Sequence, residues 1–107
     1  MNIHEFIELK GRQLAYYVSA FLANRIPYSE INLFTWDTLE EWSVLEIAPN
    51  QPYSTKEKVF WHLLHQVNFW SEGILLEDEQ VQHEIQTCIR VLTGYRTELT
   101  EFCGIRP

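Results

Sequence analysis

The chain has few basic residues and no long apolar run. It carries only 8 Lys and Arg against 15 Asp and Glu in 107 residues, which gives a formal net charge of −7. This acidic balance disfavours nucleic acid and anionic lipid as partners, because both bind to basic patches. Charged residues interrupt the apolar positions near the N-terminus, so we expect neither a signal peptide nor a membrane span.

Cysteine is also scarce, and its spacing argues against a disulfide. Cys88 and Cys103 fall in one predicted helix, where they would lie about 22 Å apart at a rise of about 1.5 Å per residue. A disulfide needs Cα atoms within about 7 Å of each other. Two unpaired thiols favour a reducing compartment, and we therefore expect a cytoplasmic protein.

Motifs that carry chemistry are missing from the sequence. The four glycines are isolated from one another, which excludes a glycine-rich phosphate loop. No Ser or Cys has a base at the spacing of a known catalytic motif. The sequence therefore predicts no catalytic residue and no cofactor.

The sequence is rich in apolar residues with helical spacing. Apolar residues make up 46% of the chain and aromatic residues 14%, which is enough for a packed core. They recur every three to four positions over 2–24, 29–47, 54–73 and 77–103, with breaks at Pro27 and at residues 49–52. Residues 31–36 are also compatible with extended structure, but we favour helix throughout. The prediction is all-α: a four-helix, mostly antiparallel bundle with 1–107 as a single domain.

Several helix ends carry capping signals. Asn2 is expected to cap the first helix, and Ser54 with Glu57 forms a capping box in which each side chain satisfies a backbone N–H. Gly73 and Gly104 are expected to end the third and fourth helices in left-handed caps.

The third predicted helix has two apolar faces. One contains Val59, Leu63, Val67 and Trp70, and the other follows an i, i+4, i+8 pattern on the opposite side. Either residues 26–52 cover this second face as part of the core, or it is exposed and binds a protein partner or a second copy of the chain. The candidate partner-binding residues are those of the second face and one neighbour: Trp61, His62, His65 and Phe69.

A second aromatic segment lies upstream. Trp36 and Trp42 flank the acidic residues Asp37, Glu40 and Glu41. Such a mixture could meet a basic partner, although tryptophans of this kind more often cover a core. We therefore do not assign these residues to a site.

The two histidines of the third helix suggest a metal site as an alternative. His62 and His65 are three residues apart, so both can reach one ion on a helix face. The helix start at residues 53–57, followed by His62, resembles the DinB-type metal-binding helical bundles. This resemblance covers under 20 residues and implies a metal-binding bundle or a metal-dependent enzyme. The chain departs from that family because it lacks later paired histidines on one helix.

The main functional prediction is a non-enzymatic protein–protein interaction module. A small acidic regulator, an inhibitor or immunity-type protein, or an adaptor would fit this description. We expect a protein partner or a second copy of the chain, and neither nucleic acid nor a membrane.

Overall fold

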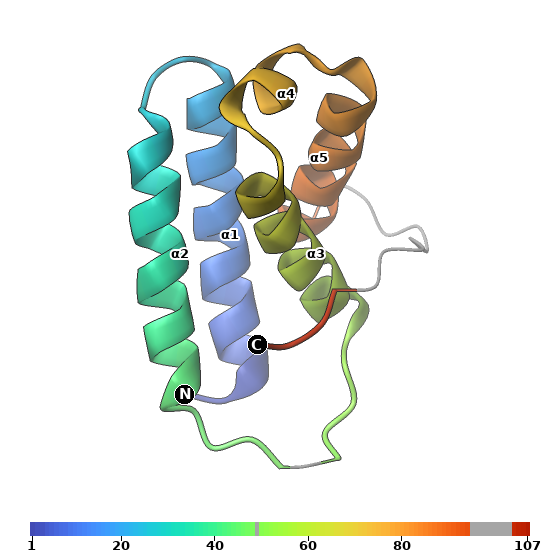
Figure 1. Ribbon diagram of the computed structural model, residues 1–107. Coiled ribbons are helices and arrows are strands. Elements are labelled where there is room, and N and C mark those ends of the chain that lie inside the picture. The colour runs from blue at the N-terminus through green and yellow to red at the C-terminus, as the bar shows by residue number, and fades with distance from the viewer. Residues whose placement is uncertain (49, 95–103) are drawn as a thin grey trace.

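The computed structural model describes residues 1–48, 50–94 and 104–107. Within these ranges the chain forms helices and no strand, which confirms the all-α prediction. The helices are α1 (Ile3–Leu22), α2 (Tyr28–Ser43), α3 (Thr55–Phe69), α4 (Glu72–Glu77) and α5 (Glu79–Leu92). Figure 1 shows that the four long helices α1, α2, α3 and α5 run alternately up and down, as an antiparallel bundle does. None of the described helices has the length and apolar character needed to cross a membrane.

Side-chain caps define where the helices begin. The Asn2 side chain accepts a hydrogen bond from the Glu5 N–H at 2.8 Å, as predicted. Ser54 accepts from the Glu57 N–H at 3.0 Å, which confirms half of the predicted capping box. The other half is wrong, because the Glu57 carboxylate turns inward to Trp61 instead of back to Ser54. Competition from an indole donor in the core outweighs this local motif.

The end of α3 differs from the prediction. The helix ends at Phe69, where Trp70 adopts extended backbone angles, and the short helix α4 follows. Ser71 caps α4 by accepting from the Ile74 N–H at 3.3 Å. Gly73 lies inside α4, so the predicted left-handed cap at Gly73 is wrong. A serine that can start a new helix is therefore the stronger local signal here.

The last helix also ends earlier than predicted. Helix α5 starts at its N-cap Asp78 and ends at Leu92, and Gly94 follows with a left-handed φ of 83°. Its predicted continuation lies among residues 95–103, outside the described part of the chain, as does Cys103. Gly104 is not the predicted helix cap, because its N–H donates to the Lys58 carbonyl on α3 at 3.1 Å.

Helix α1 packs against three other helices. It contacts α2, α3 and α5, and its buried side recurs with helical spacing at Ile3, Phe6, Ile7, Leu14, Val18 and Phe21. Gly11 allows α5 to approach, because a Cβ atom there would lie 3.3 Å from Leu92 Cδ2. Helix α2 lies on the other side of α1 from α5 in Figure 1, so one long side of α2 faces away from the bundle.

Candidate functional site

Trp61, the centre of the predicted aromatic face, belongs to the core. Only 3% of its surface is exposed, and its ring packs edge-on against Trp42 at a centroid distance of 4.9 Å. The Trp61 indole N–H donates to Glu57 Oε2 at 2.9 Å. The prediction that Trp61 is an exposed contact residue is therefore wrong, because Trp42 of α2 and the C-terminal tail cover that part of α3.

The tail that covers Trp61 consists of residues 104–107. Gly104 lies so close to α3 that an added Cβ would collide with the backbone at His62 N and Lys58 O and would lie 2.6 Å from Trp61 Cβ. Only glycine fits this position without a shift of the tail. Figure 1 shows the tail crossing beside the lower half of α3 toward the end of the bundle where the chain begins.

Arg106 anchors the tail to a buried carboxylate. Glu57 is fully buried, and Arg106 Nε and NH2 donate to its two carboxylate oxygens at 2.5 and 2.8 Å. The guanidinium also lies 4.0 Å from the centre of the Tyr53 ring, in cation–π contact. The hydrogen bonds and the charge of Glu57 raise the pKa of Arg106. The network of Glu57, Arg106 and Trp61 thus ties the C-terminal tail to the start of α3.

Helical spacing and capping motifs did not predict this network. One signal was available, because Glu57 precedes Trp61 by one helical turn and the two side chains can meet at i, i+4 spacing. Arg106 had no such signal, since it is 49 residues away from Glu57 in the sequence.

The structure gives the two histidines of the metal hypothesis different partners. The His62 ring lies 2.9 Å from Glu84 of α5, whereas His65 is exposed and stacks on Phe69 at a centroid distance of 5.7 Å. A cavity of about 220 Å³ lies beside both, lined also by Trp61, Gly104 and Ile105. No group of three or more His, Cys, Asp or Glu residues suited to a metal ion occurs among residues 1–48, 50–94 and 104–107.

Cys88 does not provide a reactive nucleophile. It is fully buried in the core, and burial, with a smaller effect from the charge of Glu84, raises the pKa of its thiol to about 12. A thiol with so high a pKa is almost wholly protonated near neutral pH and is a poor nucleophile.

Helix α2 and its C-cap residue carry three exposed large apolar side chains. Trp36 is 69% exposed, Leu33 58% and Val44, which caps the helix, 77%. At about 100° per residue around the helix axis, each of these three side chains points within roughly 60° of their mean direction. Three acidic residues share this side of the helix. We call this surface the α2 outer face: Glu30, Leu33, Trp36, Asp37, Glu40 and Val44.

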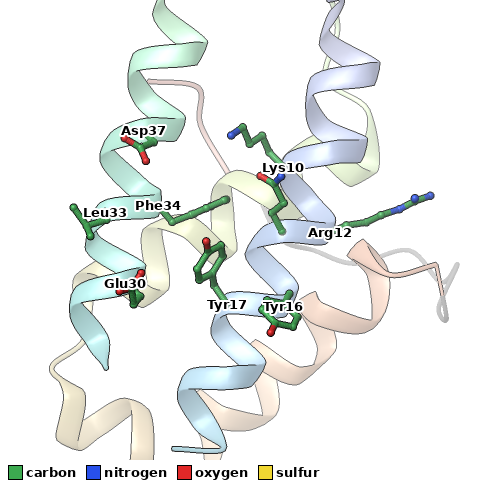
Figure 2. Close-up of a pocket in the computed structure, with 9 residues that line it drawn as sticks. Lys10, Arg12, Tyr16, Tyr17, Glu30, Leu33, Phe34 and Asp37 are labelled. Atoms are coloured by element: carbon green, nitrogen blue, oxygen red, sulfur yellow. The ribbon is translucent and has the colours of Figure 1, made fainter. Parts of the chain in front are cut away.

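An open groove adjoins the α2 outer face on the side of α1. It has a volume of about 560 Å³, and Tyr17 and Phe34 pack together in it at a ring distance of 5.1 Å. Figure 2 shows Phe34 pointing toward α1, while Leu33, which also lines the groove, extends from its outer edge. The groove therefore joins a partly buried aromatic floor to an exposed apolar rim.

The charge of this surface is negative. Glu30, Asp37 and Glu40 form no ion pair with any residue that the structure describes. Lys10, whose ammonium lies 5.6 Å from the centre of the Phe34 ring, forms an ion pair with Glu41. Arg12 extends away from α2 in Figure 2. Three uncompensated carboxylates therefore surround exposed apolar side chains.

Comparison with known proteins identifies no family for this chain. No family model matches it, and neither the curated proteins nor the solved structures contain a significant match. Its function must therefore be inferred from the chemistry of its own surface.

Proposed function

We propose that this domain is a non-enzymatic protein–protein interaction module that contacts its partner through the α2 outer face. The observation that carries the proposal is Trp36, which is 69% exposed on a regular helix beside exposed Leu33. Tryptophan is the residue most enriched among interface hot spots, and an exposed one is costly to keep in water. A partner that covered Trp36 and Leu33 would remove this cost.

Part of the predicted aromatic face on α3 is also exposed, but it lies outside the proposed contact surface. Phe69 is 64% exposed and lies between His65, which stacks on it, and Trp70, which meets it edge-on. With Trp61 in the core, this surface has lost its predicted centre. It therefore serves as the comparison surface in the experiment below.

The metal-binding alternative at His62 and His65 gains no specific support. His62 is engaged by the Glu84 carboxylate, and His65 is engaged by an aromatic ring. No group of three or more His, Cys, Asp or Glu residues suited to a metal ion includes them among the described residues.

The proposal includes a cytoplasmic location and a small acidic regulator, inhibitor or adaptor as the type of protein. Support for the location comes from Cys88, which is a free thiol in the core. Support for the type comes from the unpaired carboxylates that lie beside exposed Trp36 and Leu33 on the α2 outer face.

Paired surface variants test the proposal. Trp36→Ser and Phe69→Ser each remove one exposed aromatic side chain, and each should change the free energy of unfolding by less than about 0.5 kcal/mol. Tagged protein would be recovered from cells of the source organism, and the co-purifying proteins would be quantified by mass spectrometry. We expect a specific partner that is retained by the wild type and Phe69→Ser but reduced about tenfold or more by Trp36→Ser.

Light scattering on the same three proteins detects a second copy of the chain as the partner. A dimer that dissociates in Trp36→Ser would support the interaction surface. Identical co-purifying proteins and identical masses for the wild type and Trp36→Ser would refute it.

A further inference from the structure

The shape of the α2 outer face matches a helical ligand. Leu33, Trp36 and Val44 span 11 positions, which is about 16 Å along the helix axis. The neighbouring groove runs between two packed helices, and side chains of a third helix can enter such a groove as ridges. A partner helix of about three turns would cover the whole stripe.

The charge of the same surface specifies the flanks of that ligand. Glu30, Asp37 and Glu40 alternate with the apolar residues along α2, and none of them has an ion-pair partner in the described part of the chain. Lys or Arg beside the apolar stripe of a partner helix would meet these carboxylates. Such charge complementarity raises the association rate and selects the partner.

The charge also disfavours two other occupants. A second copy of this chain would bring two sets of three uncompensated carboxylates together in one interface. An anionic membrane would repel the same groups. A basic partner protein is the occupant that both the apolar stripe and the carboxylates favour.

We propose that the α2 outer face and the adjoining α1–α2 groove bind a basic amphipathic helix of a partner protein. This inference rests on the proposed function and adds to it the chemical class of the partner. The apolar side of that helix covers Leu33 and Trp36, and its basic flanks pair with Asp37 and Glu40.

Synthetic peptides test this inference directly. The probes are a panel of helical peptides of about 18 residues, with Leu, Phe or Trp in the apolar stripe and Lys and Arg on its flanks. A scrambled peptide of the same composition lacks the stripe, and a third version carries Glu in place of the basic residues. Binding to the full chain is measured by fluorescence anisotropy and located by amide chemical-shift changes in NMR spectra.

We expect at least one basic amphipathic peptide to bind, with shift changes centred on α2. The scrambled and acidic peptides should bind at least about tenfold more weakly. Trp36→Ser should weaken binding by about tenfold or more, and Phe69→Ser should leave it unchanged. The Asp37→Asn/Glu40→Gln double variant should weaken binding several-fold and reduce its dependence on salt.

Other outcomes would overturn the inference. These are no binding by any member of the panel, equal binding of the scrambled peptide, or shift changes that lie away from α2. If the peptides fail while a cellular partner still depends on Trp36, the interaction function stands and the helical ligand is wrong. If neither experiment shows dependence on Trp36, both proposals fail. A dimer that depends on Trp36 would support the function and replace the basic helix by a second copy.

Discussion

Removal of the Arg106 charge should strongly destabilise the fold. Glu57 is fully buried, and its carboxylate receives two hydrogen bonds from Arg106 and one from the Trp61 indole. Arg106→Met keeps an unbranched side chain against the Tyr53 ring but removes the cation. The carboxylate would then keep a single neutral donor inside the protein.

The size of the loss follows from the burial of the pair. Breaking a buried ion pair from one side costs about 3–5 kcal/mol. The Arg106 side chain retains 15% exposure, so we expect a value near the lower limit, about 3 kcal/mol. Since domains of this size are stable by only about 5–15 kcal/mol in total, this loss is a large fraction.

Urea unfolding followed by tryptophan fluorescence measures this loss. The midpoint should fall with little change in the slope, and the melting temperature should fall by roughly 12 °C, at about 4 °C for each kcal/mol. The matched control is the Glu57→Met/Arg106→Met double variant, which removes both charges. It should be more stable than Arg106→Met alone, because no charge is left buried without its partner.

Two results would contradict this reasoning. A loss below about 1 kcal/mol for Arg106→Met would mean that the buried pair contributes little. A double variant with the summed losses of the two single variants would mean that Glu57 and Arg106 act independently.

Three further predictions follow from single positions. Gly104→Ala should lower the unfolding free energy by about 2 kcal/mol, because the added Cβ collides with the α3 backbone. The control Gly73→Ala has open space around its Cβ and should not destabilise the protein. Equal urea midpoints for the two variants would contradict this prediction. In a Cys103→Ser background, a thiol reagent at pH 8 should leave Cys88 unmodified until the protein unfolds, because burial raises the pKa of the Cys88 thiol from 9.0 to about 12. Rapid modification of the folded protein would refute this prediction. The same shift favours the protonated thiol in the folded state, so the free energy of unfolding should decrease as the pH rises from 9.0 to about 12. Thr38→Val should raise the unfolding free energy by about 1 kcal/mol, because the buried Thr38 hydroxyl has no hydrogen-bond partner in the described structure; a loss of stability would contradict it.

The aromatic residues show where sequence patterns were informative and where they were not. Periodicity correctly indicated that α3 carries apolar residues on both sides. It could not show which of them water reaches, because exposure depends on neighbouring elements. Trp42 and the tail cover Trp61, whereas Phe69 lies beyond their reach at the end of α3. For the same reason, the sequence could not show that Trp36 is exposed and Trp42 is buried.

The sequence by itself determined the all-α class, the existence of the long helices and two of their starting caps. These features depend on residues within a few positions of one another, so local spacing and capping chemistry are sufficient. Only the tertiary structure decided that Arg106 pairs with Glu57, that His62 meets Glu84, and that α2 turns an aromatic and acidic side outward. Such pairings join distant segments, and they depend on how the helices pack, which no local pattern encodes.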